Sequence, residues 1–157
     1  MAEELSSAVI DWFHTRIDTI TTETRTFRRS GYRFTPAEEP DSAIDGLYYV
    51  AMDGIEAHVR GYGTTENRWV GLFSVDVGYF RGGGDMNSGD RKSINRDGAD
   101  DAMVIADIIE DPASYDGANT GIRTVTFAGA TRITQDVARD VWRVQFRVEW
   151  RSDWRAA

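Results

Sequence analysis

Two histidines, His14 and His58, are the side chains whose ordinary pKa lies near neutrality, so they are the first candidates for acid–base chemistry. His14 follows Phe13 in a segment with helical periodicity, and His58 lies in a segment with strand periodicity. No serine of the Gly-x-Ser-x-Gly type accompanies either one, and the chain contains no cysteine. We therefore expect structural or surface roles for both histidines, and we expect no catalytic residues.

Residues 85–90 resemble the start of a calcium loop, because Asp85 and Asn87 have the right spacing. The motif then requires glycine at position six and a bidentate glutamate at position twelve, where this chain has Asp90 and Arg96. The glycines at 82–84 lack the lysine and hydroxyl residue of a phosphate loop. These departures predict turn and surface chemistry, with neither a metal nor a cofactor.

The remaining chemistry of these segments is that of an interface. Residues 81–99 are polar and glycine-rich, and a loop of that length inside one domain is usually functional or disordered. Its candidate contact residues are Asp85, Asp90, Arg91, Lys92, Arg96 and Asp97. Arg143, Arg147 and Arg151 share the polar side of the last predicted strand. Trp154, near the chain end, is either an interface anchor or a residue that folds back on its own domain.

Three amphipathic segments must position these residues. Residues 141–150 alternate apolar and polar side chains, which predicts a strand with one buried face. Residues 68–80 also alternate, but their second face is mixed, which favours a central strand covered on both sides. Residues 5–22 carry an apolar stripe at helical spacing, with Ser6 or Ser7 as the predicted N-cap. We expect the helix to pack on the apolar faces of both strands.

Shorter patterns predict the remaining elements. Residues 24–35 indicate a strand, and residues 46–60 indicate two short strands around an Asp53-Gly54 hairpin turn. Residues 100–110 predict a helix capped by Asp97 or Asp100, stopped by Pro112, with a buried stripe of isoleucines and either Met103 or Val104. Residues 121–128 and 130–137 predict two strands separated by a turn. The pattern is that of one α+β domain spanning residues 1–157, a largely antiparallel sheet packed by an N-terminal helix and a second short helix.

The charge balance of the chain indicates which kinds of partner it can bind. The chain has 26 acidic and 18 basic residues, a formal net charge of −8, which disfavours nonspecific attraction to nucleic-acid phosphates. No apolar run reaches the roughly 18 residues of a membrane span. The N-terminus is acidic and lacks the basic region of a signal peptide, so we expect a protein used in a cytoplasm or in a particle assembled there.

The order of these elements resembles the tail terminator proteins of long-tailed bacteriophages. Members of that family open with a helix of the I-x-x-x-F-x-x-R-I-x-x-I kind, which residues 10–20 resemble with one residue fewer between Ile10 and Phe13. They continue to a strand of the F-x-V-x-V-x-Y kind, matching residues 73–79, a polar loop and an acidic, aliphatic helix, matching residues 101–109. A Tyr-Asp-Gly turn follows at 115–117. A strand of the R-x-F-x-V-x-[WY] kind closes the pattern, which residues 143–150 resemble with one residue more between Arg143 and Phe146. Residues 36–60 and the triple glycine depart from it.

The resemblance implies a structural virion protein without catalytic activity. It implies a homo-oligomeric ring, hexameric in the family, at the head-proximal end of a tail, where it ends tail-tube polymerisation. Its implied partners are the tail-tube protein and a head-completion or connector protein, and DNA passes through the channel without specific binding. Three alternatives stay open: another neck or connector protein, a tail-tube protein with a long stacking hairpin, and a small-molecule-binding or enzymatic α+β domain.

Overall fold

The computed structural model describes residues 2–21, 26–31, 33, 44–60, 67–80, 88–114, 121–134 and 139–151. Its elements are α1 (Ala2–Ile17), β1 (Arg28–Arg29), β2 (Leu47–Arg60), β3 (Asn67–Phe80), α3 (Ser88–Glu110), the 3₁₀ turn η1 (Pro112–Ser114), β4 (Ile122–Thr134) and β5 (Arg139–Arg151). One five-stranded sheet has the order β1-β2-β3-β5-β4. The short β1 is parallel to β2, and all other pairs are antiparallel. The α+β prediction is confirmed.

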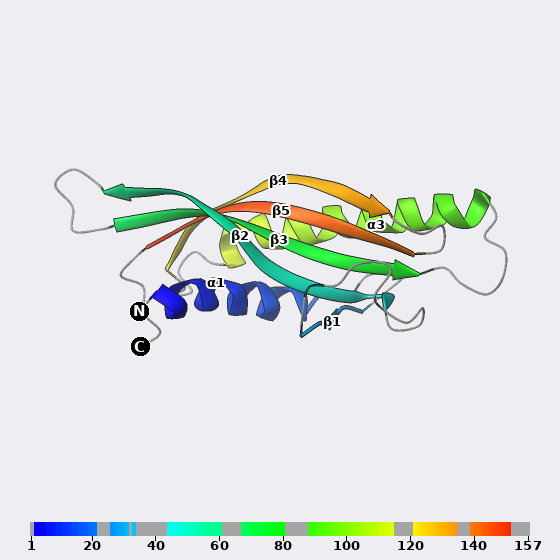
Figure 1. Ribbon diagram of the computed structural model, residues 1–157, viewed down its shortest axis with the longest axis horizontal. Helices are drawn as coiled ribbons and strands as arrows, with labels where there is room; N and C mark the ends of the chain where they lie inside the picture. Colours follow the sequence, from blue (N-terminus) through cyan, green and yellow to red (C-terminus); the bar gives the residue numbers. More distant parts are fainter. Residues whose placement is uncertain are drawn as a thin grey trace.

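Both helices lie on the same face of the sheet (Figure 1). Phe13 of α1 stacks on Phe73 of β3 at a centroid distance of 5.6 Å, and it meets Phe146 of β5 at 5.6 Å. Tyr79, on the same side of β3 as Phe73, donates a hydrogen bond to Asp101 of α3. The predicted contact of the N-terminal helix with both strands is therefore confirmed. Aromatic pairs in this geometry add to the free energy gained by burying their area.

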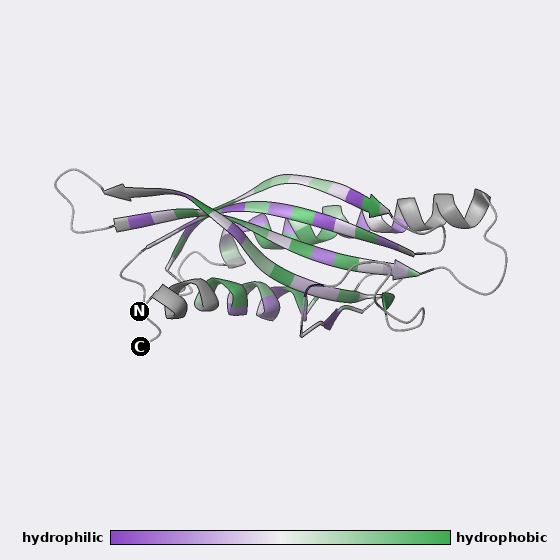
Figure 2. Cartoon of the chain, viewed as in Figure 1, coloured by the Kyte–Doolittle hydropathy of each residue, from purple (hydrophilic) through white to green (hydrophobic). Residues whose placement is uncertain are grey.

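The central strand β3 is buried on both faces, as its mixed pattern predicted. Phe73, Val75, Val77 and Tyr79 face the helices, and Ser74 and Asp76 face the other way, yet all six are almost completely buried. Hydrophobic and hydrophilic bands accordingly alternate along β3 and β5 (Figure 2). A smaller apolar cluster, around Ile44 and Val141, covers one end of the face opposite the helices.

Two predicted turns are bulges inside continuous strands. β2 runs through Asp53 and Gly54, with register shifts at Met52/Gly54 and Ile55/Ala57 instead of a hairpin. β4 likewise runs through residues 127–130, with a shift at Phe127/Gly129. Gly129 has φ +127°, a conformation that side-chain-bearing residues rarely adopt. Asp, Asn and Gly serve bulges as well as turns, so the residue types alone misled the prediction.

The helix predicted at 100–110 begins much earlier, so the predicted loop at 81–99 is wrong for residues 88–99. α3 starts at Ser88 and runs through Gly89 and Gly98. It ends at Glu110, ahead of Pro112, as predicted. Its buried stripe uses Ala102 and Ala106 with Ile105 and Ile109, whereas Met103 and Val104 are exposed, contrary to either predicted choice. α1 also differs: Ser6 and Ser7 lie inside it, and it ends at Ile17.

Gly98 explains how a polar helix packs so closely on the sheet. A Cβ atom at this position would lie 2.1 Å from Nε1 of Trp142 on β5. The glycine, a poor helix former, is therefore the residue that lets the α3 backbone approach the indole ring.

We expect Phe146→Ala to lower the free energy of unfolding by about 3–5 kcal/mol, because it empties the centre of the aromatic core. The matched control is Phe127→Ala, at the cross-strand neighbour of Phe146. Because Phe127 is 37% exposed, this substitution should lower the free energy of unfolding by only roughly 1–2 kcal/mol. Urea titration measures both. If Phe146→Ala lowered the free energy of unfolding as little as Phe127→Ala, β5 would present its other face to the helices.

We expect Gly98→Ala to destabilise the protein by about 1–3 kcal/mol, because the added methyl group overlaps Trp142. Gly54→Ala is the control, since a Cβ there meets nothing within 4 Å. That substitution should be neutral or stabilise by about 0.4–1 kcal/mol through the unfolded chain. Urea titration with unchanged m-values measures both free energies of unfolding, and a Gly98→Ala variant more stable than the wild type would refute the close approach.

Candidate functional site

The face of the sheet opposite the helices carries the predicted arginines of β5, and it is the candidate site. We call it the polar face. Its members on the described strands and at Arg33 are Arg33, Asp53, Glu56, Arg68, Ser74, Asp76, Arg143, Arg147 and Glu149. Strand alternation places the members from β3 and β5 on one side, because they occupy even positions of β3 and odd positions of β5. Arg33, Asp53 and Glu56 join them through hydrogen bonds.

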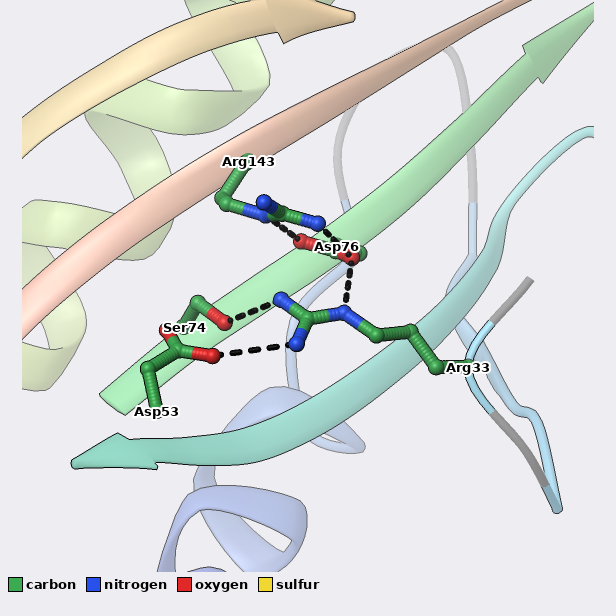
Figure 3. Close-up of polar contacts among 5 residues, drawn as sticks. All are labelled: Arg33, Asp53, Ser74, Asp76 and Arg143. Atoms are coloured by element: carbon green, nitrogen blue, oxygen red, sulfur yellow. Dashed lines mark hydrogen bonds and ion pairs between the residues drawn. The ribbon is translucent and has the colours of Figure 1, made fainter. Parts of the chain in front are cut away.

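Asp76 is the centre of the polar face and is only 1% exposed. Arg143, directly opposite it on β5, donates from Nε to Oδ1 at 2.8 Å and from Nη2 to Oδ2 at 3.0 Å. Arg33 reaches across β2 and donates from Nε to Oδ2 at 3.0 Å (Figure 3). A buried carboxylate with two guanidinium partners keeps its hydrogen bonds satisfied, which its burial requires.

Arg33 holds two strands, β2 and β3, together at this point. It also donates to Ser74 Oγ on β3 at 3.0 Å and to Asp53 Oδ1 on β2 at 3.0 Å (Figure 3). Burial alone would lower the pKa of Arg33, but the hydrogen bonds to Asp76 and Asp53 and the charges of these carboxylates outweigh it and raise the pKa. The side chain therefore fastens the segment after β1 onto the sheet as a permanent cation.

Two outer ion pairs complete the polar face. Arg147 donates to Glu56 Oε2 at 2.7 Å, and Arg68 donates to Glu149 Oε1 at 3.1 Å. Arg147 is 49% exposed, so solvent screens this pair and it adds little to stability. Because the Arg147–Glu56 pair links β2 to β5 across β3, its role is to fix the register of these strands.

The charges of the polar face cancel. Four arginines (Arg33, Arg68, Arg143 and Arg147) meet four carboxylates (Asp53, Glu56, Asp76 and Glu149). Two of the three predicted arginines, Arg143 and Arg147, are therefore neutralised within their own chain. A neighbour's acidic residues would have to displace existing partners to bind Arg143, and for Arg147 they would compete with Glu56.

The structure brings only part of the predicted interface set together. Asp90, Arg91, Lys92 and Arg96 lie on α3, and Arg151 ends β5, with the positions of their side chains outside the described part. Asp85 and Trp154 lie outside the described residues altogether. Asp97 is 3% exposed, so its prediction as a surface contact residue is wrong in this fold. The cause is the early start of α3, which makes residue 97 part of a packed helix.

A second polar cluster, at the end of α1, had no signal in the sequence. Asp18 accepts hydrogen bonds from Arg29 and from the buried Tyr48. Burial raises the pKa of Asp18, but the hydrogen bonds from Arg29 and Tyr48 outweigh it and hold the pKa below its ordinary value. Burial, together with the hydrogen bond to Asp18, raises the pKa of Tyr48.

His14 belongs to the same cluster, with its ring 5.8 Å from that of Tyr48. Burial, and then the nearby charge of Arg29, lower the pKa of His14 below 6.5. The folded state therefore binds this proton less readily than the unfolded chain. His14 favours folding fully above pH 6.5, and that contribution falls as the pH drops through the folded pKa.

Comparison with protein families and with curated protein sequences adds no assignment to this geometry. No protein-family model matches the chain, and no curated protein sequence matches it significantly. Among the described residues, no group of three or more histidine, aspartate or glutamate side chains is placed to hold a metal ion. No helix in the described part is long and apolar enough to cross a membrane.

We expect Asp76→Asn to lower the free energy of unfolding by about 2–3 kcal/mol, because it leaves two partly buried guanidinium groups without their carboxylate. Glu56→Gln removes an exposed partner on the same face and should cost less than about 1 kcal/mol. Both are measured by urea titration at neutral pH. Equal small effects would mean that Asp76 is not the centre of the polar face.

Proposed function

We propose that this chain is a structural virion protein that forms a closed ring, with six subunits, at the head-proximal end of a phage tail. In this role it ends tail-tube growth and joins the tail to the head. The observation that supports the proposal most is the arrangement of the three motif segments. Residues 10–20, 73–79 and 143–150 pack into one core, with Phe13 against Phe73 and Phe146.

The electrostatics suit a channel through which DNA moves. The chain is acidic overall, and the described polar face compensates its own arginines. A channel lined by such a protein offers few cations to hold phosphate groups, so DNA would pass without specific binding. The remaining partners in this proposal are the tail-tube protein and a head-completion or connector protein.

One feature favours a second candidate, a tail-tube protein. β2 and β3 are each 14 residues long and pair from Tyr48↔Val77 to Arg60↔Asn67. The far end of this pair projects beyond α1 and β4 (Figure 1). A projecting hairpin is the kind of element that stacks one ring on the next, and residues 47–60 form one of its strands.

Polymerisation of the tail-tube protein separates the two candidates. Tubes are grown with and without this chain, and their lengths are measured by electron microscopy. A terminator should shorten the tubes at substoichiometric concentration and be found at one end. A tube protein should polymerise by itself or enter along the whole length.

The control is the Phe146→Ala variant, whose core is damaged, at equal concentration. Tubes of unchanged length and without bound protein would contradict both candidates and favour the small-molecule-binding or enzymatic alternative. Deleting residues 83–95 is not a clean test of the interface, because it removes the first turns of α3.

A further inference from the structure

β4 is an edge strand of the described sheet, with β5 on one side and no described strand on the other (Figure 1). It is 13 residues long. Residues 124–131 carry no charge, and Phe127 in their middle is 37% exposed. A long, uncharged and partly apolar edge is the kind of strand that pairs with the edge of another chain.

The register of the sheet turns the backbone N–H of Phe127 outward, toward this edge. The Gly78 carbonyl of β3 accepts from the N–H of Gly46, directly before β2, so even positions of β3 bond to β2 and odd positions bond to β5. Phe73 therefore forms its backbone hydrogen bonds with Phe146, its partner on β5. Phe146 then directs its backbone groups away from Phe127, its partner on β4, whose N–H points away from β5.

Glu110 occupies that N–H. Its Oε1 accepts from the N–H of Phe127 at 2.7 Å, a short hydrogen bond of the kind that carboxylates form. Glu110 is the last residue of α3, where a negative charge opposes the helix dipole, so its position there does not stabilise the helix. β4 also bulges at Phe127/Gly129. A charged side chain and a bulge are two of the devices by which proteins keep edge strands from pairing.

We propose that Glu110 is a cap that keeps the β4 edge from pairing with the β4 edge of a second copy. Two identical edges meet without like-charge repulsion along residues 124–131, and Arg132 beyond them is already paired with Asp140 at 2.9 Å. An arriving strand needs the N–H of Phe127 for its ladder, and this N–H is bonded to Glu110.

The dimer that the cap prevents differs from a ring. Two β4 edges would meet antiparallel across a two-fold axis and close on themselves, whereas a ring needs two different patches. The cap thus removes a dimer that would compete with head-to-tail assembly. The inference itself holds whether or not the chain forms a ring.

Disulfide trapping tests the cap, because the chain contains no cysteine of its own. Thr126→Cys places one thiol at an exposed position of β4. When Glu110→Ala is added to it, mild oxidation should trap about tenfold more dimer, because the N–H of Phe127 becomes free to bond a second chain. Non-reducing electrophoresis measures the dimer fraction.

Two control variants, each in the Thr126→Cys background, separate the hydrogen bond from the charge. Glu110→Gln keeps an acceptor oxygen and should trap no more dimer than the protein with Glu110 intact. Asp107→Ala removes another exposed carboxylate of α3, one turn earlier, and should also leave the dimer fraction unchanged. Circular dichroism verifies that every variant is folded. If Glu110→Gln gave as much dimer as Glu110→Ala, charge alone would guard the edge and the cap would be overturned.

Hydrogen exchange of the Phe127 amide is a second measurement that needs no dimer. This amide should be protected in the wild type although it lies on an edge, and it should exchange about tenfold faster in Glu110→Ala at concentrations too low for pairing. Equal exchange in the two proteins would show that Glu110 does not cap the amide. Faster exchange without additional trapped dimer would show that the edge needs no guard. Either result overturns the inference and leaves the proposed ring untouched.

Discussion

Pairing of β3 with β5 joins two chemically different surfaces, and the other elements are arranged around that pair. On one side of the pair, Phe73 and Phe146 require an apolar cover, and α1 supplies Phe13. On the other side, Asp76 is buried and needs cationic partners, which Arg143 and Arg33 supply. A slip of one residue between these strands would place the carboxylate among aromatic rings and the rings among the arginines. The register is therefore specified from both faces.

This arrangement also decides which surfaces remain available for partners. The arginines of β5 are engaged within the chain, so the polar face carries no net charge among its described ion pairs. At one edge of the sheet α3 packs on β4 and β5, and at the other edge Arg29 of β1 is paired with Asp18. A partner that binds these arginines by charge must therefore compete with ion pairs that the chain already makes.

Strands with strict alternation could be predicted from the sequence, because the side-chain period of two is a local property. The segments that became β3 and β5 are the examples. The apolar stripe of α1 could be predicted in the same way, because helical spacing is also a local property. The first turns of α3 could not be predicted, because they extend past the end of the sheet (Figure 1) and have no apolar stripe to detect. Asp53-Gly54 was interpreted as a turn because bulges and turns use the same residues.

The candidate site was only half predictable for a related reason. Alternation correctly placed Arg143 and Arg147 on the polar side of β5. Their partners are Asp76, 67 residues away, and Glu56, 91 residues away, and no local pattern reports contacts at that separation. The partner of Asp76 on the other side, Arg33, follows a two-residue strand that carries almost no periodicity.

The central claim is that this chain acts as a closed homo-oligomer and not as a single subunit. Native mass spectrometry of the purified protein, alone and with tail-tube protein, tests it most directly. The account predicts one discrete species at six times the 17.6 kDa subunit mass, formed alone or on addition of tail-tube protein. A strict monomer under both conditions, or a continuous ladder of masses without a closed species, would contradict it.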